Sequence, residues 1–286
     1  MNEFTTIFEA ERPKLTALCY RMLGECAGAE DAVQDTWLRW ENADRSAIKN
    51  HSAWLRRTAG RIAIDALRSA RSRRETYVGP WLPEPLIEAA GRTVEEDFIL
   101  AQECSLALLW AMERLSETER LAFILREAFD AGYDEIATTL NKSEAACRQL
   151  VSRAHKRLQE SGPRFDTPEE DVSQLLARFF AASAAEDFGE ALSLLASDAI
   201  ALTDGGRKAR AARRPLIGPQ DILQVWAAIM QKANQETGGS IELGVANGAP
   251  ALVRRIDGKN DTVITVMPNA SGQIAWLYAM RNPDKL

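Results

Sequence analysis

Two clusters of basic side chains in this sequence have the types and spacing needed to bind phosphate groups. Between Trp54 and Arg74 the chain carries seven arginines and a single acid, Asp65. Residues 141–158 carry three arginines and two lysines against one acid, Glu144. Clustered cations on helices are typical of contacts with nucleic-acid phosphates. Each cluster alone could be a solvated helix face, but two of them in separate helical segments favour DNA or RNA.

The charge of the whole chain hides these clusters. The 286 residues carry 35 basic and 41 acidic side chains, a net charge of −6, which by itself argues against a nucleic-acid partner. Most of the excess acid lies in residues 76–140, where 13 acidic side chains accompany 4 basic ones. We therefore expect basic helices in acidic surroundings, a distribution that weakens non-specific DNA binding by the free protein.

Composition also excludes several classes of protein. A hydrophobic fraction of 46% and a charged fraction of 27% are ordinary for folded domains. Four scattered cysteines and only two histidines argue against a zinc site or a disulfide framework, so no metal and no cofactor are expected. No apolar stretch approaches the roughly 18 residues of a membrane helix, and Glu9 and Glu11 interrupt any signal-peptide core. The sequence predicts a cytoplasmic protein without membrane contact.

Breaks in helical periodicity divide the chain into domains. Prolines between Tyr77 and Leu86, and again between Ser161 and Pro168, cannot continue a helix. The sequence therefore predicts domains at 1–75, 100–160 and 168–286, with a linker at 76–99, which agrees with the two or three domains that this length suggests.

Residues 1–75 are predicted to form an all-α domain. Helices are expected at 4–22 and 29–40, and a third helix is expected after an N-cap at Ser52, with a polar loop before it. Asp31, Asp35 and Arg39 share one face of the second helix. That face is either a solvated surface with an Asp35–Arg39 ion pair, which composition alone favours, or a docking surface for a basic partner.

Residues 100–160 are predicted to form a second all-α domain with a helix-turn-helix. Ser116 and Glu119 have the capping-box spacing at the start of one helix, which should end at Gly132. A short helix at 133–140 then leads through a turn at Asn141 into a basic helix from Ser143. The width of such a helix fits the major groove of DNA.

Residues 168–286 are predicted to form an α+β cone. Helices are expected at 168–185, 188–196 and 219–232, and a curved antiparallel sheet is expected from strands at 199–203, 241–245, 251–256, 262–267 and 273–278. This domain has no histidine, and its carboxylates Asp198, Asp204 and Asp221 show no paired spacing. We therefore expect no catalytic residues, whereas a small-molecule ligand in the cone stays an open possibility.

The helical domains resemble those of bacterial sigma factors, most closely the extracytoplasmic-function (ECF) group. Residues 20–24, 29–40 and 53–68 resemble sigma region two, and residues 106–158 resemble region four, in the expected order. The resemblance implies a factor, not an enzyme, that binds core RNA polymerase, recognises the −10 and −35 elements of promoter DNA, and initiates transcription. One departure is Gly60, where the family helix more usually carries a side chain; glycine there costs about 1 kcal/mol relative to alanine.

The resemblance also implies which residues make the contacts. Core polymerase would bind Asp31, Gln34, Asp35, Leu38 and Arg39. The −10 element would bind Asn42, Asp44, Arg45, Ser46, Lys49, Asn50, Trp54, Arg57, Arg61 and Arg68. The −35 element would bind Lys142, Ser143, Glu144, Arg148, Gln149, Ser152, Arg153 and Lys156.

The third domain resembles the SnoaL-like extension of a sigma-J-like subgroup. Its signatures are matched by residues 77–86, by Asp204-Gly205-Gly206-Arg207-Lys208 and by Asn282-Pro283-Asp284-Lys285-Leu286. Regulatory contacts between domains are implied for Trp81, Pro83, Asp204, Gly205, Gly206, Lys208, Asn282, Pro283 and Asp284. Arg207 replaces a glycine of the family loop, so an altered loop or an added contact is expected, although a simple tight turn would also account for this segment.

These observations together predict an alternative sigma factor that its C-terminal domain regulates in cis. A core-independent helix-turn-helix regulator with a ligand-sensing cone is the main alternative hypothesis, and a SnoaL-like enzyme is the other.

Overall fold

The computed structural model describes residues 3–88, 98, 101, 103–160, 168–235 and 239–286. The described residues form two compact units. The first unit takes in those of 1–76, 94–104 and 108–161, and the second takes in those of 77–93, 105–107 and 162–286. Both predicted helical domains therefore lie in one unit, and the described start of the predicted linker belongs to the unit of the C-terminal domain.

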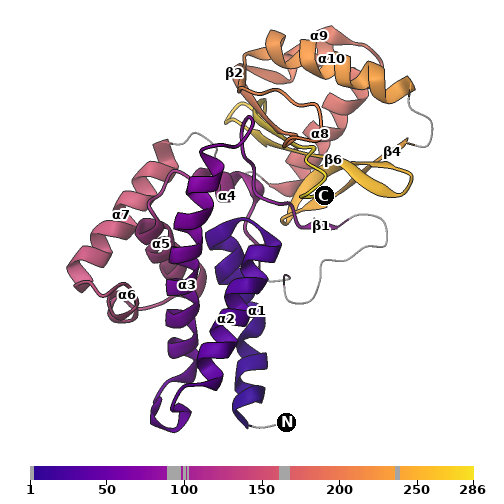
Figure 1. Cartoon of the computed structure of the whole chain (residues 1–286). Coiled ribbons are helices and arrows are strands. Elements are labelled where there is room, and N and C mark those ends of the chain that lie inside the picture. Colours follow the sequence, from indigo (N-terminus) through magenta and orange to yellow (C-terminus); the bar gives the residue numbers. More distant parts are fainter. Residues whose placement is uncertain (1–2, 89–97, 99–100, 102, 161–167, 236–238) are drawn as a thin grey trace. The chain divides into compact units, whose positions relative to one another are not determined.

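Three long helices form the first half of the first unit: α1 (Glu3–Leu23), α2 (Cys26–Glu41) and α3 (His51–Arg74), which run side by side (Figure 1). A short 3₁₀ turn at Arg45–Ala47 lies between α2 and α3. The helix α3 starts earlier than predicted. Asn50, not Ser52, is its N-cap, because the Asn50 side chain accepts a hydrogen bond from the Ala53 N–H at 3.0 Å.

The second half of this unit consists of α4 (Leu106–Met112) from residue 108 onward, α5 (Glu117–Phe129), α6 (Tyr133–Leu140) and α7 (Glu144–Glu160). The predicted capping box is confirmed, since Ser116 and Glu119 exchange both hydrogen bonds. Asn141 adopts a left-handed φ of 52°, as its place in the turn predicts. The helix α5 runs to Phe129, and the break predicted at Gly132 falls two residues earlier, at Asp130, which has a φ of 46°; Gly132 is the N-cap of α6.

The second unit contains a seven-stranded sheet in the order β1-β4-β5-β6-β7-β2-β3. Its strands are β1 (Ile87–Glu88), β2 (Leu195–Asp204), β3 (Leu216–Ile217), β4 (Gly239–Ala246), β5 (Ala249–Ile256), β6 (Lys259–Pro268) and β7 (Ile274–Met280). The five predicted strands are confirmed, but the prediction of an all-antiparallel sheet was wrong, because β2 pairs in parallel with β7. The two-residue strands β1 and β3 are too short to show a periodic pattern.

Helices α8 (Glu169–Ala184), α9 (Phe188–Ser193) and α10 (Pro219–Gln235) complete the second unit. Pro168, where the helix was predicted to begin, is the N-cap of α8 rather than its first residue. The core joins these helices to the sheet through residues such as Leu176, Phe179 and Trp226, with the last two rings 5.2 Å apart. The predicted order of all-α domains followed by an α+β domain is confirmed.

Candidate nucleic-acid interface and linker anchor

One face of α2 presents an exposed, mainly acidic surface. Asp31, Gln34, Asp35 and Leu38 follow each other at three- and four-residue spacing and are all exposed, while Val33 and Trp40 on the opposite face are buried. The Leu38 side chain is 47% exposed. The neighbouring Arg39 is also exposed, and no Asp35–Arg39 ion pair forms among the described residues. A leucine flanked by carboxylates that no cation neutralises is suited to an apolar partner surface with a basic rim.

The loop between α2 and α3 rests on a cluster of aromatic rings. The ring of Trp40 lies 6.1 Å from that of Phe4, 5.3 Å from His51 and 5.4 Å from Trp54, and the Arg45 guanidinium stacks 4.8 Å from the Phe4 ring. The remaining polar side chains predicted for the −10 element are exposed on this loop, namely Asn42, Asp44, Ser46, Lys49 and Asn50. A polar loop on a rigid aromatic base can hold an unstacked nucleotide base.

Several arginines of the first basic cluster, on α3, bind the second half of the unit. Arg56 pairs with Glu135 on α6 at 2.9 Å, and Arg61 donates to the backbone oxygens of Thr139 and Thr138 at 2.9 and 3.1 Å. Arg71 and Arg74 pair with Glu117 and Glu113 in the α4–α5 segment, at 2.7 and 2.6 Å. Of the other arginines predicted to contact the −10 element, Arg57 makes no ion pair or hydrogen bond within the described chain, and the exposed Arg68 pairs only loosely with Asp65 at 3.4 Å.

Gly60 lies where α3 packs against Leu121 of α5. A Cβ at this position would come within 3.0 Å of Leu121 Cδ2, a contact tighter than carbon atoms normally make. Both residues are buried. Glycine lowers the stability of the helix itself, but its lack of a side chain allows α3 to pack closely on α5.

A buried charge network joins α1, α4 and α5. Arg120 has no solvent exposure; its Nε donates to the Arg21 backbone oxygen at 2.9 Å, and it pairs with Glu113. Burial raises the pKa of Glu113, but the guanidinium groups of Arg120 and Arg74 outweigh it and hold the pKa below its ordinary value. Such a network keeps its stability only while every charge remains paired.

The helix α7 and the two residues before it carry the side chains predicted for the −35 element. Cys147 and Leu150 are buried, while Lys142, Ser143, Glu144, Arg148, Gln149, Ser152, Arg153 and Lys156 are exposed. Arg148 pairs with Glu144 at 2.8 Å and stacks 4.8 Å from the Tyr133 ring. Arg153 pairs with Glu119 at 3.0 Å, so this arginine also stabilises the packing of α7 on α5. The exposed row is continuous and has the dimensions of a groove-reading helix.

In the second unit, the start of the linker is attached to the sheet around one carboxylate. We define the linker anchor as Tyr77, Leu82, Asp204, Asn282 and Lys285. The Tyr77 hydroxyl and the Leu82 N–H donate to the two oxygens of Asp204 at 2.5 and 3.0 Å. Lys285 donates to Asp204 at 2.8 Å and to the Leu82 backbone oxygen at 2.6 Å, and Asn282 donates to the Tyr77 hydroxyl at 2.9 Å.

Further contacts surround the linker anchor. The Lys285 ammonium lies 4.2 Å from the Trp81 ring centroid, and Pro83 is buried. Burial, followed by the hydrogen bond to Asp204, raises the pKa of Tyr77 well above its ordinary value. Farther along, the Leu86 N–H donates to the Asn247 side chain at 3.0 Å, and β1 pairs with β4. The linker start is thus an integral part of this unit.

At both glycines of the 204–208 segment, a side chain would collide with neighbouring atoms. Gly206 has a φ of +57°, and a Cβ there would lie 2.8 Å from the Asn282 side chain. Gly205 is buried, and a Cβ there would overlap the Ala209 backbone oxygen. Arg207 is not among the described residues with positive φ, so the departure from the family pattern is accommodated without backbone strain.

The predicted regulatory residues come together only in part. Trp81, Pro83, Asp204, Gly205, Gly206 and Asn282 lie at or beside the linker anchor, and Lys208 pairs with Asp284 next to it. Pro283 is exposed. Tyr77, Leu82 and Lys285 were missed as site residues although their segments were recognised, because only the folded chain shows that their polar atoms meet at Asp204.

A small cavity lies between α10 and the sheet in the described part of the second unit. The cavity beside Thr203, Trp226, Thr262 and Arg281 measures about 20 Å³, enough for about one water molecule. Among the described residues, no group of three or more His, Cys, Asp or Glu side chains could hold a metal ion. No helix in the described part of the chain is long and apolar enough to cross a membrane.

Comparison with known proteins agrees with the division of the first unit. Residues 7–73 match Sigma-70 region 2, and residues 105–158 match Sigma-70 region 4. The chain is 34% identical to the ECF RNA polymerase sigma factor SigJ of Mycobacterium tuberculosis, over 97% of this chain and 91% of SigJ. It is also 34% identical to the probable ECF sigma factor SigI of the same species, over 54% of this chain and 53% of SigI. The crystal structure of M. tuberculosis SigJ superposes with a TM-score of 0.78 at 30% identity, covering 98% of this chain and 97% of SigJ.

Proposed function

The chain belongs to the ECF RNA polymerase sigma factors, and we propose that its C-terminal domain regulates it in cis through the linker that follows region 2. Membership of this family makes it a DNA-binding transcription initiation factor and not an enzyme. Since a sigma factor works with core polymerase on the chromosome, the cytoplasm is the proposed place of action.

Core RNA polymerase is the proposed partner of the α2 face. Support comes from the exposure of Asp31, Gln34, Asp35 and Leu38 on one side of the helix, where neither carboxylate forms an ion pair with another described residue. Arg39 borders the same face. An exposed leucine within a charged surface provides an apolar contact, and the surrounding charges orient the partner.

Promoter DNA is the proposed partner of the α2–α3 loop, of α3 and of α7. The exposed polar loop over the Trp40 cluster would receive a flipped base of the −10 element, and Trp54 and Arg57 would contact the adjacent strand. The exposed row of α7 would read the −35 element in the major groove, where arginine recognises guanine and glutamate recognises cytosine.

The contacts of α3 within the first unit suggest that the free protein is held in a closed form. Arg61 is a predicted −10 contact, yet its guanidinium already donates to two backbone oxygens at the end of α6. These two bonds occupy Nε and one Nη and fix the orientation of the guanidinium toward α6, which leaves fewer of its five N–H donors for DNA. We infer that the packing of α3 against α4–α6 must loosen before the first unit engages both promoter elements.

The main support for regulation in cis is the linker anchor, which attaches the start of the linker to the C-terminal domain. Only Glu75 and Thr76 separate Arg74, the last residue of α3, from Tyr77, and the three Cα–Cα steps between them can span no more than about 11 Å. Movement of the linker anchor is therefore transmitted directly to α3. The linker anchor restrains region 2 while it is closed and frees it when it opens.

The test is transcription from a cognate promoter by core polymerase at limiting sigma factor. Tyr77→Phe deletes the hydroxyl that joins Asp204 to Asn282, and a lost hydrogen bond of about 1 kcal/mol corresponds to roughly fivefold more initiation than wild type. Tyr133→Phe, which removes a hydroxyl outside the linker anchor, should behave as wild type. A protein of residues 1–165 should escape the restraint altogether.

Two results would count against this proposal. Failure of every variant to initiate while core binding is intact would contradict the sigma mechanism. Equal activity of wild type, Tyr77→Phe and residues 1–165 would remove the basis for regulation through the linker anchor.

A further inference from the structure

A third concentration of positive charge, outside both sigma regions, lies directly after the Asp204-Gly205-Gly206 turn. We define the basic loop as residues 207–214, where five cations and no acid occur in eight positions. Lys208 pairs with Asp284. The four arginines of the basic loop, Arg207, Arg210, Arg213 and Arg214, are exposed and have no ion pair or hydrogen bond from their side chains within the described chain.

The fold holds this loop in a defined shape. The Ala209 N–H donates to the Gly205 backbone oxygen at 2.9 Å, and the Thr203 hydroxyl exchanges two hydrogen bonds with the Ala212 backbone at 2.8 and 3.1 Å. The Arg281 guanidinium donates to the Arg210 backbone oxygen at 2.7 Å. Five cations on one short loop without an acid give it a positive potential, which is suited to an anionic ligand.

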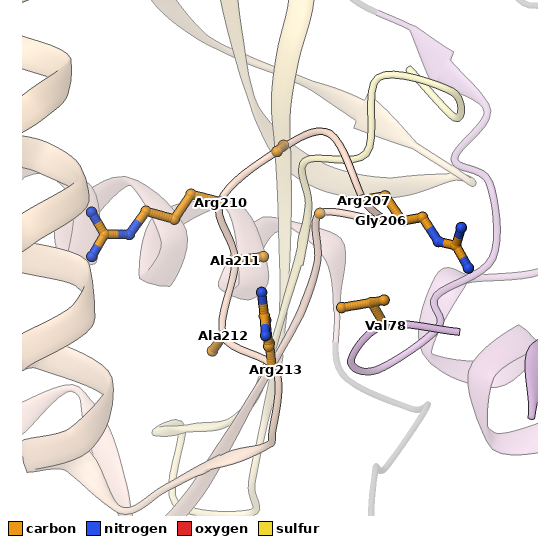
Figure 2. A pocket seen from close by; sticks show the side chains of 9 residues that line it. Val78, Gly206, Arg207, Arg210, Ala211, Ala212 and Arg213 are labelled. Atoms are coloured by element: carbon orange, nitrogen blue, oxygen red, sulfur yellow. The ribbon is translucent and has the colours of Figure 1, made fainter. Parts of the chain in front are cut away.

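The basic loop surrounds a cavity of about 240 Å³. It is lined by Val78 of the linker, by Gly205 and Gly206, and by all residues of the basic loop except Lys208 and Arg214. Figure 2 shows the Arg207 and Arg210 side chains extending in opposite directions, with Arg213 between them and Val78 on the linker side. This volume is below the 300–1,000 Å³ typical of drug-sized ligands and suits a smaller molecule.

We propose that this cavity binds a small phosphate-bearing anion with at least two negative charges, of the diphosphate class. Arginine presents a planar fork of donors that matches phosphate oxygens in a bidentate manner. Arg213 is in place at the cavity, and rotation of the flexible Arg207 and Arg210 side chains brings two more guanidinium groups to the ligand. A mononegative ion would leave most of this charge uncompensated.

The cavity is coupled to the linker by direct contact. Gly79 has a φ of +83°, and a Cβ at this position would lie 3.3 Å from the Arg213 Cα. The linker backbone therefore packs against the basic loop, which itself begins beside Asp204. A ligand that neutralises the arginines relieves repulsion in the loop and so stabilises the linker anchor.

Calorimetric titration of the full chain with pyrophosphate tests the proposal. We expect saturable binding with a dissociation constant below about 1 mM, and a rise in the unfolding temperature at saturating pyrophosphate. Arg213→Ala should weaken binding about tenfold, the loss of one charge-assisted hydrogen-bond pair. Arg214→Ala is the matched control, because it removes the same charge from the same loop without removing a lining residue.

Three outcomes would overturn the proposal. The first is no binding of pyrophosphate by the wild-type chain at about 1 mM. The second is equal weakening by Arg213→Ala and Arg214→Ala, which would indicate long-range attraction without a site. The third is that Arg213→Ala lowers affinity for a short non-promoter DNA duplex but leaves pyrophosphate binding unchanged, which would identify the loop as a polynucleotide contact.

Discussion

The ammonium of Lys285 donates to the carboxylate of Asp204 across 2.8 Å, in a pair whose side chains are 9% and 0% exposed. Burying two charges is favourable only if their remaining hydrogen-bonding capacity is satisfied. Two of the other donors to Asp204, the Tyr77 hydroxyl and the Leu82 N–H, come from the linker. The buried pair and the attached linker therefore depend on each other and should form and break together.

Removing the charge of Asp204 should destabilise the second unit. Asp204→Asn leaves Lys285 buried without its counter-ion, and breaking a buried pair costs about 3–5 kcal/mol. We expect a lower unfolding temperature and faster chymotrypsin cleavage after Tyr77 and Trp81. Asp198→Asn is the control, because Asp198 lies on the same strand but is exposed. Similar stability and cleavage of both variants would show that the linker anchor does not hold the linker.

Acidification should weaken the first unit through Glu113. The pKa of this carboxyl is lowered in the folded protein, so its stabilising contribution is present above its ordinary pKa of about 4.5 and is lost as the pH falls below it. Denaturant unfolding of wild type and Glu113→Gln from pH 7 to pH 3 measures this. The stability difference between the two should shrink on acidification; a pH-independent difference would contradict the assignment.

A larger side chain at position 60 should separate α3 from α5. Gly60→Leu places a branched side chain against the buried Leu121, and overpacking of this kind costs about 1–3 kcal/mol. Hydrogen exchange should show loss of protection in α5 and α6, while the sheet of the second unit keeps its protection. The double variant Gly60→Leu, Leu121→Ala makes room and should recover part of the loss. No recovery would mean that the substitution acts elsewhere.

Charge reversal on the α2 face should weaken binding of core polymerase. Asp35→Lys places a cation in the centre of the acidic surface, and loss of charge complementarity should reduce affinity about tenfold. Glu9→Lys makes the same reversal at an exposed site on α1 and should bind as wild type. Pull-down with purified core enzyme measures both. Equal retention of the two variants would exclude the α2 face as the docking surface.

Local signals in the sequence were sufficient for most elements. Ser116 and Glu119 act within one helical turn, and Asn141 needs only its own left-handed backbone, so the capping box and the turn of the helix-turn-helix were predicted correctly. The five longer strands were found because each alternates or is continuously apolar. The basic loop was not predicted as a charge cluster, because the net charge of residues 159–286 as a whole is negative.

By itself the sequence determined the sigma regions, their order and the helices that form them, because these depend on residues close together in the chain. The tertiary structure alone decided what the charged side chains contact. It pairs β2 in parallel with β7, directs several α3 arginines to α4–α6, and joins Tyr77 to Asn282 across 205 positions. Such partners are chosen by packing and by the need to satisfy buried polar groups, and neither is encoded in local periodicity.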